Sequence, residues 1–103
     1  MTRVCATLAL ILSAGIGAAS ASAADGARGG QLARQWCANC HVVGGAPAAT
    51  VQQGPPSFRS IAQGELTADQ LRTFLPRPHP LMPDLSLTRT EIDDLIAYIE
   101  TLR

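Results

Sequence analysis

The sequence has no lysine: its eight basic residues are all arginines, and eight acidic residues balance them to a formal net charge of zero. Without a basic stripe, nothing supports nucleic-acid binding. Without lysines, a lysine-ringed and strongly basic docking face is also excluded, so charge attracts a protein partner only modestly or through a few arginines. Strand-like alternation of apolar and polar residues is missing too, and we therefore expect an all-α domain.

The first 23 residues have the composition of a secretory signal. Arg3 is their only charge, an apolar stretch covers residues 4–16, and small residues end the segment at Ala21-Ser22-Ala23. We predict that this signal peptide, 1–23, is cleaved and that the mature domain, 24–103, is periplasmic. An uncleaved membrane anchor is the alternative, because the segment approaches spanning length. Removing Arg3 leaves seven arginines against eight acidic residues, a formal charge of −1.

Cysteine is scarce, with only three in the chain. Cys5 lies in the predicted signal, so export leaves Cys37 and Cys40 and no further thiol for a disulfide elsewhere. Both belong to Cys37-Ala38-Asn39-Cys40-His41, the C-x-x-C-H signature of c-type haem attachment. Thiols three positions apart lie within one helical turn, so both can form thioether bonds to one porphyrin. We expect one permanent haem c, bound by the two thiols, with His41 as an axial iron ligand.

Other uses of this pentapeptide fit it less well. A dithiol redox pair expects a βαβ context, which the sequence around Cys37 does not show. A zinc site needs four ligands, and beyond the pentapeptide only His79 remains besides scattered carboxylates. A structural disulfide between Cys37 and Cys40 leaves the adjacent His41 unexplained.

Two capping boxes predict helices in the second half of the chain. Thr88-Arg89-Thr90-Glu91 starts a helix over 88–102, whose apolar residues follow the 3.6-residue period. Its acidic residues are interpreted as a solvated face: Glu91, Asp93, Asp94 and Glu100. Thr67-Ala68-Asp69-Gln70 starts a second helix, which Pro76 ends. The residues expected to be buried on that helix are Leu71, Phe74 and Leu75.

A third helix is expected to lead into the pentapeptide, with Asp25 as its cap. Gly29 and Gly30 weaken it, which indicates that another backbone comes close there, and the C-terminal helix is the expected partner. The alternative is a flexible entry to a helix that begins only at Gln31. Between the pentapeptide and residue 66 the chain is irregular, apart from a short turn at 57–62, and we expect it to wrap the haem.

The chain resembles a small class I cytochrome c, the mono-haem bacterial type, over nearly all of its mature length. The residues that carry the resemblance are the pentapeptide, Gly29-Gly30-Gln31-Leu32, Asp94–Ile99, Gly54-Pro55 and Met82-Pro83. The resemblance implies the cytochrome c fold: about three main helices and irregular loops around one covalently bound haem.

The resemblance also implies the pocket around that haem. A glycine of the first helix would pack against Leu95 and Tyr98, and the carbonyl of Pro55 would accept a hydrogen bond from His41. Many members have a phenylalanine at the position of Ala33, and Trp36 is expected to fill that space. The candidate haem-pocket residues are therefore Pro55, Trp36 and Tyr98.

Met82 is the only methionine left after signal removal, and it lies in a proline-rich loop before the last helix. The resemblance implies that it is the sixth ligand of the iron; filling a gap in the core is the alternative role for a methionine. His79 is the competing ligand. Thioether ligation favours ferrous iron and raises the reduction potential.

Iron with two protein ligands has no open position for a substrate, so we expect a one-electron carrier between periplasmic protein partners rather than an enzyme. An electron-transfer subunit of a periplasmic oxidoreductase complex is the alternative. A peroxidase-like or ligand-binding haem protein is the third hypothesis. Membrane contact is expected only through transient docking or an uncleaved signal, and the protein would be a monomer or a subunit of a complex.

Overall fold

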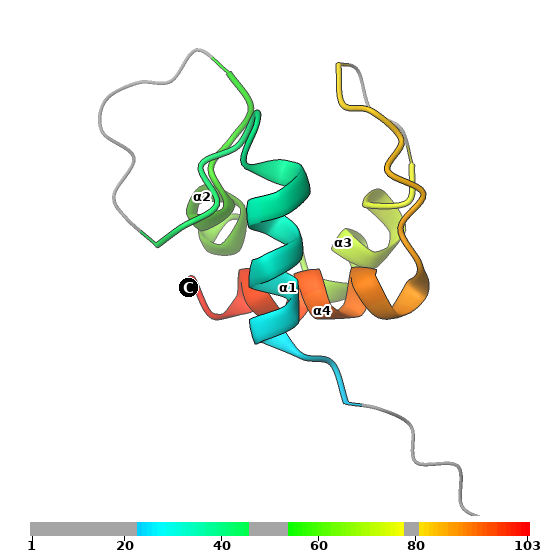
Figure 1. The fold of residues 1–103 in the computed structure, drawn as a ribbon. Helices are drawn as coiled ribbons and strands as arrows, with labels where there is room; N and C mark the ends of the chain where they lie inside the picture. The colour runs from blue at the N-terminus through cyan, green and yellow to red at the C-terminus, as the bar shows by residue number, and fades with distance from the viewer. Residues whose placement is uncertain (1–22, 46–53, 78–80) are drawn as a thin grey trace, which may run out of the picture.

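The computed structural model describes residues 23–45, 54–77 and 81–103 (Figure 1). Its elements, in chain order, are α1 (Gly26–Leu32), the π-helical turn η1 (Ala33–Cys37), α2 (Phe58–Gln63), α3 (Ala68–Phe74) and α4 (Arg89–Glu100). The described residues form no strand, and the prediction of an all-α domain with about three main helices is confirmed. Within these ranges, none of the helices is long and apolar enough to cross a membrane. His79 and the signal segment up to residue 22 lie outside the described residues.

Asp25 starts α1 as predicted. Its side chain accepts hydrogen bonds from the backbone amides of Ala27 and Arg28, at 2.9 and 3.1 Å, which contributes about 1 kcal/mol to a helix start. The helix begins at Gly26, so the alternative start at Gln31 is wrong. It continues without a break into η1, which ends at Cys37, the first residue of the pentapeptide.

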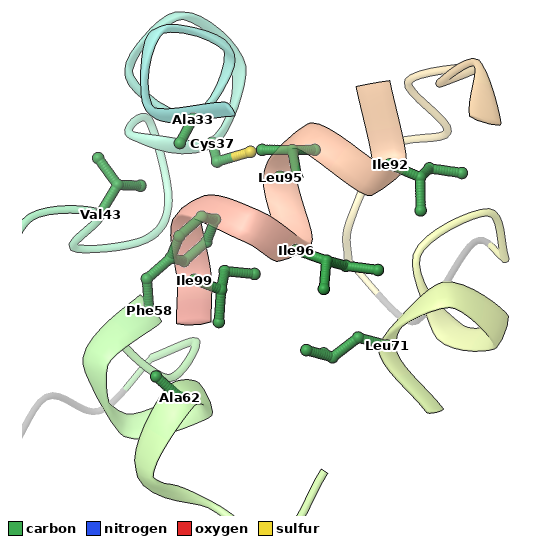
Figure 2. Close-up of a cluster of buried hydrophobic side chains, with 10 residues drawn as sticks. All are labelled: Ala33, Cys37, Val43, Phe58, Ala62, Leu71, Ile92, Leu95, Ile96 and Ile99. Carbon is green, nitrogen blue, oxygen red and sulfur yellow. The ribbon is translucent and has the colours of Figure 1, made fainter. Parts of the chain in front are cut away.

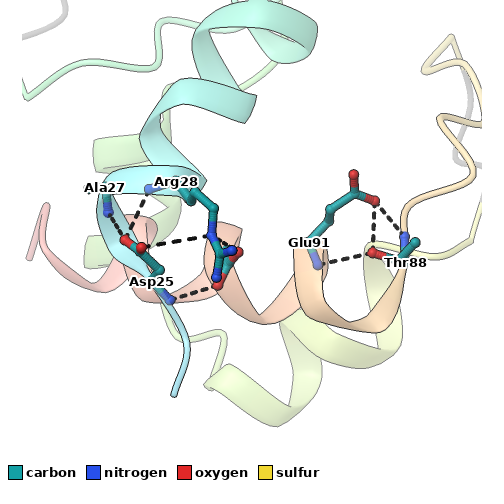
Figure 3. A network of polar contacts seen from close by, with 6 residues as sticks. Asp25, Ala27, Arg28, Thr88 and Glu91 are labelled. Atoms are coloured by element: carbon teal, nitrogen blue, oxygen red, sulfur yellow. Dashed lines mark hydrogen bonds and ion pairs between the residues drawn. The ribbon is translucent and has the colours of Figure 1, made fainter. Parts of the chain in front are cut away.

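Both capping boxes are confirmed, because this signal depends only on residues three positions apart. In α3, the Thr67 amide donates to the Gln70 side chain and the Gln70 amide donates back to the Thr67 hydroxyl, at 2.8 and 3.2 Å. In α4, Thr88 and Glu91 repeat the exchange (Figure 3). Hydrogen bonds from the Thr88 amide and hydroxyl hold the pKa of Glu91 below its usual value.

The predicted close approach of α1 to the C-terminal helix is confirmed (Figure 1). A Cβ atom at Gly29 would lie 1.9 Å from the Asp94 carbonyl oxygen and 2.9 Å from the Leu95 nitrogen. A Cβ atom at Gly30 would lie 3.1 Å from the Tyr98 ring. Glycine is therefore required at position 29, where the two backbones meet, whereas position 30 is tight against a side chain.

The core is built around α4, which contacts α1, α2 and α3 (Figure 2). Four of its apolar side chains are buried against residues of the other elements. The buried apolar residues are Ala33, Cys37, Val43, Phe58, Ala62, Leu71, Ile92, Leu95, Ile96 and Ile99. On α3, Leu71 is buried as predicted and Leu75 packs against the core, but Phe74 is 46% exposed, so its predicted burial is wrong. Phe74 follows Leu71 by three positions, so helical spacing puts both on one side of α3. The contact of α3 with α4 buries Leu71 but not Phe74.

Asp94 contradicts its interpretation as a solvated residue, since it is only 2% exposed. Its Oδ1 accepts a hydrogen bond from the Asp25 amide at 2.6 Å, and its Oδ2 lies 3.1 Å from Nε of Arg28. Figure 3 shows Asp25 and Arg28 at the start of α1, where these bonds form. The carboxylate therefore fastens the start of α1 to α4, beside the glycine contact.

We expect Asp94→Ala to lower the free energy of unfolding by about 2 kcal/mol, because it leaves the partly buried Asp25 amide without its acceptor and removes the buried partner of Arg28. Asp94→Asn keeps one acceptor oxygen and is expected to lose less. Asp93→Asn is the matched control, since its pairing with Arg72 is exposed and contributes little. Denaturant unfolding of the haem-loaded variants measures the three values. If Asp94→Asn and Asp93→Asn lowered the free energy of unfolding equally, the role given to Asp94 would be contradicted.

Candidate functional site

The pentapeptide forms a tight turn at the end of η1. The amides of Cys40 and His41 both donate to the Cys37 carbonyl, at 3.1 and 2.9 Å, so the three residues lie on one turn, as their spacing predicted. Both cysteines are free thiols; Cys37 is buried and Cys40 is exposed. Burial raises the pKa of the Cys37 thiol. The disulfide alternative therefore has no support in this structure.

His41 has a defined orientation. Its Nδ1 lies 2.7 Å from the carbonyl oxygen of Pro56. A carbonyl can only accept, so Nδ1 carries the proton and donates it, which leaves the lone pair of Nε2 for a metal. The acceptor is Pro56 and not Pro55, which the resemblance implied. The Phe58 amide donates to the Val42 carbonyl at 2.9 Å, and this pairing brings Pro56 level with His41.

Phe58 is a site residue that sequence reasoning missed. Its buried ring lies edge-on to the imidazole of His41, with centroids 5.6 Å apart and an interplanar angle of 61°. The same ring is 6.4 Å from that of Tyr98. The only available signal was that Phe58 is the one aromatic residue between His41 and Leu66.

The other predicted pocket residues lie on different parts of the structure. Tyr98 faces Gly30 from α4, and Gly29 meets the backbone at Leu95, so the predicted helix contact is present. Ala33 is fully buried, whereas Trp36 is 51% exposed and outside the buried cluster. Trp36 thus does not fill the space that a larger residue would occupy at Ala33. Its contact with haem stays a prediction, as does that of Pro55.

Met82 lies half-buried in the loop that leads to α4. The chain turns sharply just before it, because Leu81 has a φ of 70°. Left-handed backbone is uncommon for a bulky residue and is found most often where surrounding structure or function requires it. That the Met82 thioether is the sixth ligand of the iron stays a prediction.

The donor set suits a covalent haem. It consists of two free thiols on one turn, an imidazole whose Nδ1 is already bound, and one thioether in a separate loop. Cys37 and Cys40 would hold the porphyrin, and His41 would bind the iron. Among the described residues, no group of three or more His, Cys, Asp or Glu could hold a metal ion alone.

The fold and this donor set define a c-type cytochrome domain, and comparison with known proteins agrees. A family model described as cytochrome c oxidase, cbb3-type, subunit III matches residues 24–99. Cytochrome c-552 of Bradyrhizobium diazoefficiens is 42% identical over 97 residues, which cover 93% of this chain and 92% of that protein. No solved structure gives a significant match. The chain belongs to the family of mono-haem c-type cytochromes.

Membership of this family settles the class of function. The protein is an electron carrier rather than an enzyme, it carries one covalent haem c, and its partners are redox proteins. Bacterial c-type cytochromes are extracytoplasmic.

Proposed function

We propose that the chain is an exported one-electron shuttle in which His41 and Met82 are the two axial ligands of the haem iron. The observation that carries this proposal is the 2.7 Å contact between Nδ1 of His41 and the Pro56 carbonyl. It fixes the tautomer and leaves the lone pair of Nε2 for the iron, on the same turn as the two thiols that would hold the porphyrin. Haem c supplies reversible one-electron exchange when bound.

Met82 is proposed as the second ligand because its loop leads directly into a rigidly capped α4. A thioether donates weakly, so it stabilises ferrous iron and raises the reduction potential. With both axial positions filled, substrate chemistry would require Met82 to leave, and peroxidase-like activity is correspondingly disfavoured.

Met82→Ala tests the ligation. The oxidised parent is expected to show the weak sulfur-to-iron charge-transfer band at the red end of its visible spectrum, and the variant is expected to lose it and bind carbon monoxide rapidly when reduced. His79→Ala is the matched control, three positions away in the same loop, and should keep the band. A parent without the band, or a band lost in His79→Ala and kept in Met82→Ala, would contradict the proposal.

Export by cleavage after residue 23 is also proposed. It is supported by the signal-like composition of the first 23 residues and by a family match that starts at residue 24. The mature protein would then be periplasmic.

A second candidate is a role as the electron-transfer subunit of an oxidoreductase complex. The name of the matched family, an oxidase subunit, favours it. The free shuttle is placed first because cytochrome c-552 matches over 92% of its own length. Purification from native membrane and soluble fractions separates the two: a shuttle is recovered free from the soluble fraction, whereas a subunit co-purifies with its complex.

A further inference from the structure

Several hydrogen bonds hold the chain that begins at His41, the last residue of the haem-attachment motif. We call residues 41–45 the exit loop. Four of its five residues each bond to a residue outside it. These bonds are His41 Nδ1 to the Pro56 carbonyl (2.7 Å), the Phe58 amide to the Val42 carbonyl (2.9 Å), the Tyr98 hydroxyl to the Val43 carbonyl (2.6 Å) and Nη1 of Arg59 to the Gly45 carbonyl (2.6 Å).

Tyr98 differs from the other three partners because it comes from α4 and not from residues 56–59. Tyr98 is linked to His41 indirectly, through two sets of contacts. Its hydroxyl holds the carbonyl of Val43, two residues beyond His41. Its ring lies 6.4 Å from that of Phe58, which in turn meets the imidazole edge-on at 5.6 Å.

Tyr98 is itself held firmly. Gly30 of α1 passes so close that a Cβ atom there would lie 3.1 Å from two ring carbons. The aromatic ring therefore has α1 on one side and Phe58 on another, and little freedom to rotate. A hydroxyl on such a ring keeps a constant position relative to α4.

We propose that Tyr98 is a positioning residue for His41: it ties the exit loop and Phe58 to α4 and so keeps Nδ1 of His41 on the Pro56 carbonyl. This inference rests on the proposed function, in which His41 binds the haem iron through Nε2. A bound Nδ1–H makes the imidazole a stronger donor to the metal. Since a stronger donor favours ferric iron, loosening this bond is expected to raise the reduction potential.

Tyr98→Phe in the haem-loaded protein is the test, because it removes the hydroxyl and keeps the ring. Losing one hydrogen bond makes local opening of the exit loop about fivefold more frequent. The Nδ1–H proton of His41, observed by NMR in the reduced protein, is expected to exchange with solvent about fivefold faster, and the midpoint potential is expected to rise. Tyr98→Leu removes the ring contact with Phe58 as well and should show larger changes of the same sign; if it does not fold, Tyr98→Phe alone decides.

Arg103→Gln is the matched control. It removes the side-chain hydrogen bonds and ion pair with Glu100 near the same end of α4, and in the described structure these do not involve the exit loop or Phe58. It should leave the proton exchange and the potential at the parent values. If Tyr98→Phe lowers thermal stability yet keeps both parent values, Tyr98 is only structural and the inference is overturned. Failure of the proposed function would give a different result. The parent protein, with Tyr98 in place, would then lack the sulfur-to-iron charge-transfer band.

Discussion

Replacing both motif cysteines, as Cys37→Ser/Cys40→Ser, is expected to leave the chain largely unfolded, with less than about half of the helical circular dichroism of the haem-loaded protein. The buried apolar residues in the described structure are few, and two of them are alanines. A domain of this size rarely gains more than about 3–5 kcal/mol from such a core. A covalent haem adds a large apolar surface at the end of η1, where Cys37 already belongs to the core. Folding and haem attachment are therefore expected to be coupled.

Far-ultraviolet circular dichroism of the exported double variant checks this expectation. Cys5→Ser is the control, because it also removes a cysteine but lies in the predicted signal segment, outside the described residues. It should yield the parent spectrum and full haem content. A double variant with a native-like helical spectrum would show that the helices form without haem, and would refute the coupling.

The features that sequence predicted well are those set by neighbours along the chain. The capping boxes at Thr67 and Thr88 and the cap at Asp25 each depend on side chains reaching backbone amides two or three residues away. The C-x-x-C-H turn is equally local. The contact at Gly29 is not local, but paired glycines in a helical pattern carry a strong signal, because they weaken the helix unless something comes close.

The features that sequence missed depend on how distant elements meet. Asp94 has the composition of a surface helix residue, and only the arrival of Asp25 and Arg28 across the α1–α4 crossing explains its burial. Which proline carbonyl accepts the hydrogen bond from His41, that of Pro56 or that of Pro55, depends on a backbone pairing between Phe58 and Val42. No local pattern in the sequence specifies that pairing. Periodicity likewise identifies which residues share a face of α3, but not how much of that face α4 covers, hence the error at Phe74.

The contacts of Asp94 and Tyr98 meet at the crossing of α1 and α4. Asp94 contributes its carbonyl to the contact with Gly29 and its carboxylate to the start of α1. Tyr98, one turn further along α4, contacts Gly30 and the exit loop. Because α1 continues into η1, this crossing also sets where Cys37 lies relative to the core. A change at the crossing is thus expected to reach the haem site.

Gly29→Ala is expected to lower the free energy of unfolding of the haem-loaded protein by about 3 kcal/mol or more, and the melting temperature by more than about 12 °C. The new methyl group would lie 1.9 Å from the Asp94 carbonyl oxygen and 2.4 Å from its carbon, so backbone and not a flexible side chain must move. Parting the helices also stretches the bonds from Asp94 to Asp25 and Arg28.

Gly26→Ala is the matched control in the same helix. Its methyl group would meet the Ala97 backbone at 3.5 Å, an ordinary contact, so the change is expected to stay within about 0.5 kcal/mol. Thermal unfolding followed by circular dichroism compares the two variants directly. Alanine is the better helix former at both positions, so propensity alone predicts stabilisation in each case. A large loss confined to Gly29→Ala can therefore come only from the crossing, whereas two equally stable variants would show that α1 and α4 do not approach as closely as the structure has them.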